Sequence, residues 1–387
     1  MPNVEKEIAD LIEPLVSFRR DIHAHPELGF EEFRTANKIA EALKDIGLEV
    51  HTGIGKTGVV GVLRNGSSDR SLAFRADMDA LPIHEETGLS YASKSSGVFH
   101  GCGHDGHVAM LLGAARHLAR TKRFGGTVNF VFQPAEEGLG GANEMIKEGL
   151  FDICPTDEIY ALHNWPDLDA GMIQTRPGPI MAAADKFEIT LNGSGGHAAL
   201  PHQTPDTLLA ASELVSKLNS IISRRVSAFD SAVLTVTQIN GGHTHNVIPA
   251  KVIVGGTVRT FDVEIQDRIE QSLRDMVESV ALAHEVKSFT HYDRYYPATI
   301  NDPDAAEQAI KSAKSICKCA EMAPDPAFTS EDFSFMLQAK KGAYVWLGQK
   351  EGESSCPLHH PKYDFNDKVI PLGIQWYSKL AEDILVP

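Results

Sequence analysis

The residues with the clearest capacity for chemistry lie in the segment GCGHDGH, residues 101–107. Cys102 and His104 are two positions apart, so in extended or loop backbone both side chains fall on one side and can converge on one ion. A thiolate and an imidazole together suit zinc and other borderline transition metals. A Cys-x-His pair also occurs in ordinary loops, so the segment by itself is only a candidate metal site.

A second candidate is the segment QPAEEG, residues 133–138, which follows an apolar run. Neighbouring carboxylates repel each other, so Glu136 and Glu137 after a buried strand are costly unless cations are present. One division of labour lets Glu137 bind a metal while Glu136 stays free as a general base. The alternative is a solvated acidic turn.

Polar residues also follow two other predicted strands. Asp77 and Asp79 come after the apolar run 72–75, and His163 ends the run 159–163. The carboxylate of Asp79 could orient a metal-binding histidine, a common partner for such imidazoles. A lone histidine at a strand end is more often structural than a ligand.

Two further imidazoles, His359 and His360, stand near the C-terminus. Taken together, the patterns predict five metal ligands, enough for two ions if one carboxylate bridges them. The predicted ligands are Cys102, His104, Glu137, His163 and His359.

Predicted strands and helices alternate along the first part of the chain, and they must position these residues. Strands are predicted at Val59–Leu63, Leu72–Arg75, Thr127–Phe132 and Ile159–His163, and helices at Phe33–Ile46, Gly106–Arg120 and Ala142–Glu148. Such alternation predicts an α/β fold with a largely parallel sheet. Sites in these folds lie beyond the C-terminal ends of the parallel strands.

A second, smaller domain is predicted after the segment Arg176–Ile180. Residues 186–292 give the order β-α-β-β-α-β, which is the ferredoxin-like α+β unit. We therefore expect a catalytic domain in two parts, residues 1–183 and 296–387, with residues 184–295 inserted between them.

The composition limits the kinds of binding partner and the cellular compartment that we expect for this protein. With 36 Lys+Arg against 52 Asp+Glu, the net charge is −16, which disfavours nucleic acid and anionic membranes as partners or simply favours solubility. The chain has no long apolar run, and Met1–Asp10 has no signal-peptide pattern. The five cysteines lack framework spacing, so we expect reduced thiols and a cytoplasmic protein.

The ordered motifs resemble the M20 metallopeptidase superfamily, in particular its amidohydrolase branch of hippurate hydrolases, N-acetyl-diaminopimelate deacetylases and plant auxin-conjugate hydrolases. The resemblance spans nearly the whole chain. Its motifs are DIHAHPELGFEE (21–32), RADMDALP (75–82), GCGHDGHVAMLLGAA (101–115), FQPAEEGLGGA (132–142), GGHAALPH (195–202), NVIPA (246–250), GTVRTF (256–261), SEDFSF (330–335) and LHHPKYDFND (358–367).

The resemblance implies the same five ligands. It makes Glu136 the general base and Asp79 a carboxylate that contacts a metal ligand rather than the metal. In other branches a metal histidine occupies the place of Asp77 and the cysteine is absent, so the resemblance gives Asp77 no ligand role. The family pattern His-x-Pro selects His359 over His360.

For the smaller domain, the resemblance implies a lid and dimerisation role. His197 resembles a substrate-contacting histidine that reaches an active site across a dimer interface, so a homodimer or higher oligomer is expected. Asn246 and Arg259 resemble polar substrate contacts, and the planar guanidinium of Arg259 suits a carboxylate. The alternative for Arg259 is a surface salt bridge.

The sequence thus predicts a metal-dependent amidohydrolase that cleaves N-acyl amino acids or similar peptide-like molecules. Each subunit would hold two divalent ions, manganese or zinc, with cobalt or nickel also suited to the donors. One alternative is a dipeptidase or carboxypeptidase of the same superfamily. Another is a metal-dependent binding protein without catalysis, although a merely structural site has no need of a free base such as Glu136.

Overall fold

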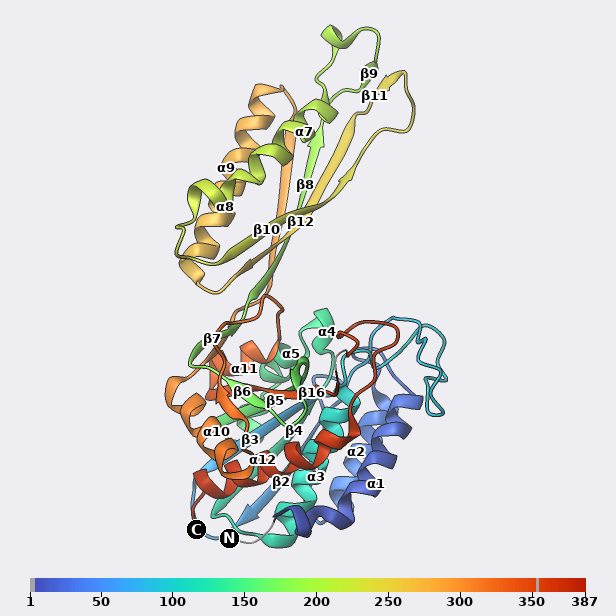
Figure 1. The fold of residues 1–387 in the computed structure, drawn as a ribbon. Helices are drawn as coiled ribbons and strands as arrows, with labels where there is room; N and C mark the ends of the chain where they lie inside the picture. The colour runs from blue at the N-terminus through green and yellow to red at the C-terminus, as the bar shows by residue number, and fades with distance from the viewer. Residues whose placement is uncertain (1–3, 353–354) are drawn as a thin grey trace. The chain divides into compact units, whose positions relative to one another are not determined.

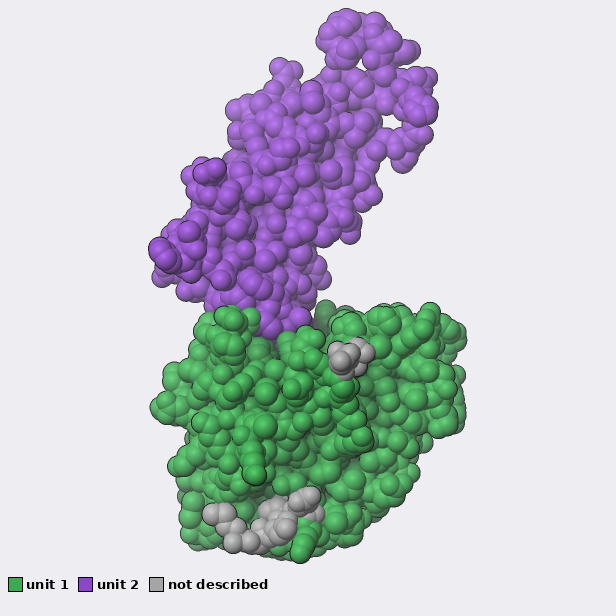
Figure 2. Space-filling view, in the orientation of Figure 1, with its two compact units in different colours: residues 1–180, 299–326, 332–387 green, residues 181–298, 327–331 purple. Residues whose placement is uncertain are grey.

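The computed structural model describes residues 4–352 and 355–387, which form two compact units (Figure 2). The first unit comprises Met1–Ile180, Thr299–Pro326 and Asp332–Pro387, and the second comprises Met181–Ala298 and Ala327–Glu331. The sequence placed the boundaries at 183/184 and 295/296, and it did not anticipate that Ala327–Glu331 groups with the inserted unit.

The first unit is built on a mixed sheet, which confirms the α/β class (Figure 1). Within the described residues it has eight strands in the order β1-β2-β4-β3-β5-β16-β6-β15. Their bounds are β1 Glu49–Ile54, β2 Gly58–Asn65, β3 Ser71–Asp77, β4 Gly126–Gln133, β5 Glu158–Asp169, β6 Ile173–Thr175, β15 Ala320–Met322 and β16 Lys341–Lys350.

Only the centre of this sheet, β4-β3-β5-β16, is continuously parallel. On one side β2 runs antiparallel to both β4 and β1, and on the other β6 runs antiparallel to β16. The expectation of a largely parallel sheet therefore holds for the centre and for the edge pair β6 and β15, which run parallel to each other. The connection between β1 and β2 is too short for a crossover, so these strands must run antiparallel.

Helices of the first unit pack around α3 (His104–Thr121), which is buried over most of its length. Its middle, residues 108–115, is apolar on every side, as expected of a helix inside a core. It contacts α1 (Val4–Ala24), α2 (Phe33–Asp45) and α12 (Ile370–Ile384), and α12 also contacts α10 (Pro303–Ile316). The helix begins two residues before the predicted Gly106, so His104 lies in its first turn.

The second unit has the predicted ferredoxin-like topology. Its sheet has the order β10-β12-β8-β13, and each neighbouring pair is antiparallel. The elements are β8 Ala183–Asn192, α7 Thr207–Leu218, α8 Ser220–Arg225, β10 Ala232–Asn240, β12 Lys251–Thr260, α9 Val263–Ala283 and β13 Lys287–Tyr296.

The helix predicted over Thr207–Ser223 is two helices that meet at Asn219. The Asn219 side chain donates a hydrogen bond to the Val215 carbonyl at 2.8 Å, and the Ser220 hydroxyl donates to the Lys217 carbonyl at 2.6 Å. Such local side-chain bonds compete with the helix ladder, which explains the break.

Shorter elements complete the described chain. They are α4 Glu136–Leu139, α5 Gly141–Lys147, α6 Leu150–Ile153, β7 Gly178–Met181, β9 Gly196–His197, η1 Pro201–Gln203, β11 Val247–Ile248, β14 Thr299–Asn301, α11 Phe333–Ala339 and η2 Asp367–Val369. None of the helices in the described ranges is both long enough and apolar enough to cross a membrane.

A buried arginine on α1 joins three parts of the first unit. Arg19 is 0% exposed, and its guanidinium lies 3.0 Å from Asp105 on α3 and 2.8 Å from Asp367 at the start of η2. It also stacks over the rings of Tyr91 and Phe365. Since Asp105 is itself fully buried, this cation balances a charge that solvent cannot reach.

Replacing Arg19 by Met should destabilise the first unit by about 3–5 kcal/mol, because it leaves a buried carboxylate without its main cation. The exposed neighbour Arg20, which also pairs with Asp367 at 2.8 Å, is the matched control, and Arg20→Met should cost about 1 kcal/mol or less. Trp165, Trp346 and Trp376 all belong to the first unit, so tryptophan fluorescence during urea unfolding reports on it. Equal losses in both variants would contradict the prediction.

Candidate metal centre

The structure brings the five predicted ligands together. One ligand atom each from Cys102, His104 and Glu137 lies within 4.8 Å of the other two. The Sγ atom of Cys102 is 3.5 Å from Nε2 of His163, and Nε2 of His359 is 3.2 Å from Oε1 of Glu137. Cys102 lies in the turn before α3 and His104 at the start of α3, while the others come from α4, from β5 and from the loop before η2.

The parallel strands explain the convergence. Arg75 on β3 pairs with Ala161 on β5, so Asp77 at the end of β3 lies level with His163. Because β4 is parallel to β3, the turn that follows it reaches the same edge of the sheet. His163 lies inside β5 rather than at its end, since the strand continues to Asp169 beside β16.

Gly103 allows the segment between Cys102 and His104 to approach its neighbours closely. Its φ is +89°, and a Cβ there would lie 2.5 Å from both Asn164 Oδ1 and the Tyr363 hydroxyl. Only glycine has neither the steric cost of this backbone conformation nor a side chain to clash. The glycine thus lets the chain turn so that both candidate ligands enter the cluster.

Two buried atoms in the cluster indicate that a cation belongs there. Among the described residues, His104 Nε2 and Glu137 Oε1 are inaccessible to solvent and have no hydrogen-bond partner. Buried polar atoms are normally satisfied, and these two belong to residues of the kinds that bind divalent transition metals. The thiol, imidazole and carboxylate donors therefore fit a divalent ion.

Asp79 supports two members of the cluster. Its Oδ1 lies 3.2 Å from Nδ1 of His104, and its Oδ2 accepts the backbone N–H of Glu137 at 3.0 Å. An acceptor at Nδ1 favours the tautomer that leaves Nε2 free as a donor to metal. Asp79 therefore lies beside His104 and Glu137, and its supporting role stays a prediction.

The two C-terminal histidines differ in their surroundings. His359 has a left-handed backbone, with φ of +65°, and its N–H donates to the Gly101 carbonyl at 2.8 Å. Its side chain is half-exposed and reaches Glu137. Nδ1 of His360 instead accepts the Lys362 N–H in an exposed turn. This geometry favours His359 as the ligand candidate.

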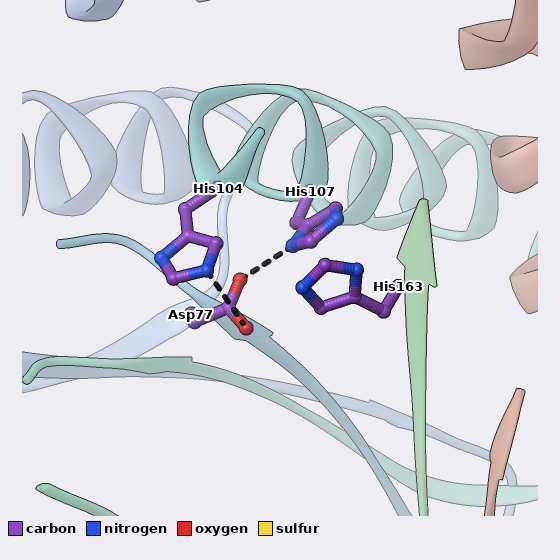
Figure 3. Close-up of side chains that lie close together, drawn as sticks. All are labelled: Asp77, His104, His107 and His163. Atoms are coloured by element: carbon purple, nitrogen blue, oxygen red, sulfur yellow. Dashed lines mark hydrogen bonds and ion pairs between the residues drawn. The ribbon is translucent and has the colours of Figure 1, made fainter. Parts of the chain in front are cut away.

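A second group that could hold an ion was not predicted from the sequence; it is formed by Asp77, His104, His107 and His163 (Figure 3). His107 Nδ1 lies 2.5 Å from Asp77 Oδ1, and Asp77 Oδ2 accepts from Arg75 at 2.7 Å. Both oxygens of Asp77 are therefore engaged, which favours a supporting role for this carboxylate. The three-residue spacing of His104 and His107 on one helix was the signal available in the sequence.

Glu136 lies beside the cluster and is 7% exposed. Its Oε1 is 3.4 Å from the backbone N–H of Asp332. The Asp332 carboxylate accepts hydrogen bonds from Arg75, Gln133 and the Ala142 N–H at 3.1, 2.8 and 2.9 Å. This buried network, which was not predicted from the sequence, anchors Asp332, whose N–H faces Glu136.

The three remaining predicted residues belong to the second unit. His197 on β9 pairs with Val247 on β11, and the Asn246 carbonyl accepts the Ala198 N–H at 3.0 Å, so His197 and Asn246 are neighbours. Arg259 on β12 donates to the Thr257 hydroxyl and to the Val258 carbonyl. Within the described residues it forms no ion pair, so its charge is not neutralised by a carboxylate.

Electrostatics of the metal-free cluster are dominated by its carboxylates. Burial opposes protonation of His104, but Asp77, Asp79 and Glu137 outweigh it and raise its pKa to about 10. Burial raises the pKa of the Cys102 thiol well above its ordinary value, and Glu137 and Glu136 add to that effect. Both groups therefore carry protons near neutral pH in the absence of a metal.

Comparison with known proteins gives consistent matches. The family model for peptidase family M20/M25/M40 matches residues 73–383. Hippurate hydrolase of Campylobacter jejuni is 41% identical over 381 residues, 98% of each chain, and N-acetyl-L-cysteine deacetylase of Bacillus subtilis is 39% identical over 98% of this chain and 90% of that protein. Thermostable carboxypeptidase 1 of Saccharolobus solfataricus is 36% identical over 98% and 97%.

Among solved structures, a Bacillus subtilis protein described as a dinuclear metal-binding peptidase of the M20 family superimposes with a TM-score of 0.85. It is 32% identical to this chain, and the match covers 97% of this chain and 99% of that one.

Metal binding should release protons, because a thiolate and a neutral imidazole are the binding forms. Replacing Cys102 by Ser should reduce the number of protons released when Mn²⁺ or Zn²⁺ binds at pH 7.5 by about one per protein molecule. It should also weaken the affinity for the metal. Titration calorimetry in buffers of different ionisation enthalpy measures the number of protons released. Cys154→Ser, at a buried cysteine elsewhere in the first unit, is the control, and the idea fails if both variants release as many protons as the wild type.

Proposed function

The chain belongs to peptidase family M20/M25/M40, and from that membership we propose that it is a metal-dependent amidohydrolase that cleaves the amide bond of N-acyl amino acids. The observation that carries the proposal is the gathering of Cys102, His104, Glu137, His163 and His359 at one edge of the sheet. The relatives named for hydrolysis of hippurate and of N-acetyl-L-cysteine support the substrate class.

The five residues would hold two divalent ions, with manganese or zinc as first choices and cobalt or nickel also compatible with the donors. The position of Glu137 supports a dinuclear centre. Its Oε1 lies 4.0 Å from His104 Nε2 and 3.2 Å from His359 Nε2, so one carboxylate stands between two imidazoles. The description of the related Bacillus subtilis structure as dinuclear is consistent with this arrangement.

When bound, such ions acidify a water molecule and polarise the carbonyl of the scissile amide. Glu136 would take the proton of the attacking water and later deliver it to the departing amine. Its support is positional, since it adjoins Glu137, is largely shielded from solvent and is held by the Asp332 N–H. Asp79 would keep His104 and the Glu137 backbone in place.

We assign the second unit to substrate recognition and lid closure. His197 would stabilise the developing oxyanion, a contribution of about 3–4 kcal/mol for one donor, in the active site of a partner subunit. Asn246 and Arg259 would bind the substrate carboxylate, for which the unpaired charge of Arg259 is suited. Homodimerisation and a cytoplasmic location complete the proposal, and the five free cysteines favour a reducing compartment.

A carboxypeptidase or dipeptidase activity is the second candidate, favoured by the 36% identity to the Saccharolobus carboxypeptidase. Acylated amino acids and short peptides share the same scissile amide. Only the pocket around the acyl or amino group separates the two activities, so the choice rests on a substrate panel.

Replacing Glu136 by Gln should lower kcat about 10²–10⁴-fold, because the proton of the attacking water loses its acceptor. Bound metal should remain, since Glu137 is untouched. Steady-state kinetics with metal analysis measures both. Glu144→Gln, at a partly exposed glutamate nearby on α5, is the control. If Glu136→Gln retained full turnover, the base assignment would be wrong, and a protein inactive on every amide would be a binding protein.

Chelator-stripped protein should be inactive and should recover with Mn²⁺ or Zn²⁺. Initial rates on N-benzoylglycine, N-acetylcysteine and unblocked dipeptides, with and without each metal, test the substrate class. We expect the acylated amino acids to be cleaved faster. Metal-dependent cleavage of dipeptides alone would replace the amidohydrolase by the peptidase.

A further inference from the structure

A carboxylate outside the donor set lies behind the turn that carries Glu136 and Glu137. Glu32, directly before α2, is 0% exposed. Its Oε2 accepts the Thr57 hydroxyl at 2.6 Å, and its Oε1 accepts the backbone N–H of Ala135 at 2.8 Å. Ala135 immediately precedes Glu136, the proposed base. Glu32, 103 positions away in sequence, therefore binds the backbone directly next to that base.

Ala135 has an unusual conformation for a residue with a side chain. Its φ and ψ are +53° and +45°, in the left-handed region. A non-glycine residue stays there only when its surroundings hold it. Gly29 packs so closely that a Cβ on it would lie 3.0 Å from the Cα and Cβ of Ala135. The direction in which Glu136 and Glu137 leave the strand therefore depends on contacts made by other segments.

Two carboxylates hold this turn by its backbone. Glu32 binds the N–H of Ala135, and Asp79 binds the N–H of Glu137 at 3.0 Å. Glu136 stands between the two bonds. Asp79 also contacts His104, so its role in the cluster is already accounted for. The Glu32 side chain instead bonds to Thr57 and to the Ala135 backbone, neither of which is a candidate ligand.

The hydrogen-bond acceptor, rather than the charge, is what Glu32 contributes. Burial, opposed by the Thr57 hydroxyl and reinforced by Asp79, raises the pKa of Glu32 to about 7. Both hydrogen bonds to Glu32 come from uncharged donors, the Thr57 hydroxyl and the Ala135 N–H, so a side-chain oxygen at this position can accept from the Ala135 N–H without carrying a charge. An amide of the same length should do the same.

We propose that Glu32 is a positioning residue, which holds the left-handed turn at Ala135 and so sets where Glu136 and Glu137 lie. The inference rests on the proposed function, in which Glu136 is the base and Glu137 a ligand. A purely structural role, in which Glu32 only joins α2 to the turn after β1, would affect stability without a selective effect on catalysis or metal binding.

Two substitutions of Glu32 distinguish the effect of its side-chain length from the effect of its charge. Glu32→Gln keeps the length and loses the charge, whereas Glu32→Asp keeps the charge and withdraws the acceptor by one methylene. We expect Glu32→Gln to keep kcat within about threefold of the wild type and Glu32→Asp to lower it about 10–100-fold, with KM nearly unchanged. The exposed neighbour Glu31 provides the control, Glu31→Gln.

Metal binding gives a readout apart from activity, because the same turn carries Glu137. In chelator competition with Mn²⁺ alone, Glu32→Asp should bind about tenfold more weakly than Glu31→Gln. Thermal unfolding and circular dichroism give the folded fraction of each variant, by which kcat is corrected.

A second change tests the turn itself. Glycine adopts the left-handed conformation without help, so Ala135→Gly in the Glu32→Asp background should recover much of the lost kcat. If Glu32→Asp does not fold, Thr57→Val, which removes the hydroxyl that orients Glu32, takes its place with the same expected loss and the same recovery.

The inference is overturned if Glu32→Asp, corrected for folding, matches Glu31→Gln in kcat and metal affinity. It is also overturned if Glu32→Gln loses as much as Glu32→Asp, or if Ala135→Gly restores nothing. These outcomes are distinct from failure of the proposed function. Full turnover by Glu136→Gln would remove the base itself, whereas an inactive Glu136→Gln beside a fully active Glu32→Asp would refute only the positioning role.

Discussion

Negative charge buried at the C-terminal edge of the central sheet must be balanced by cations that are buried with it. Arg75 does this for Asp77 and Asp332, and Arg19 does it for Asp105. Neither arginine reaches solvent, so each remains favourable only while its carboxylates stay in place. The fold and the cluster are therefore coupled, since the helices and loops that supply the donors are held by the same ion pairs that neutralise the surrounding acids.

Three further carboxylates, those of Asp79, Glu32 and Glu136, accept hydrogen bonds from backbone N–H groups, which carry no net charge. Asp79 and Glu32 bind the turn after β4 at two successive points, and the Asp332 N–H lies against Glu136. This arrangement lets Glu136 and Glu137 stand side by side although like charges repel. It also leaves Glu137 Oε1 without a hydrogen bond of its own, which is what a metal ligand requires before the ion arrives.

Patterns of local origin were predictable. The strands β2 to β5 and the β-α-β-β-α-β order of the inserted unit follow from apolar runs and turn residues, and both are found in the structure. The break at Asn219 was not, because it depends on side-chain hydrogen bonds that compete with the helix. The antiparallel strands that flank the centre of the large sheet were not predicted. An apolar run indicates that a strand is buried, but it does not indicate the direction of the neighbouring strand.

The sequence by itself determined the kinds of donor and their order along the chain, since a thiol, imidazoles and paired carboxylates next to apolar strands already specify metal chemistry. Only the tertiary structure decided which of them meet. It placed His107 against Asp77 and joined Arg75 to Asp332 across 257 positions of sequence. It also brought Glu32 to Ala135 across 103 positions. Such contacts arise from parallel strands that end at one edge, and no spacing along the chain encodes which side chains that edge will bring within hydrogen-bond distance.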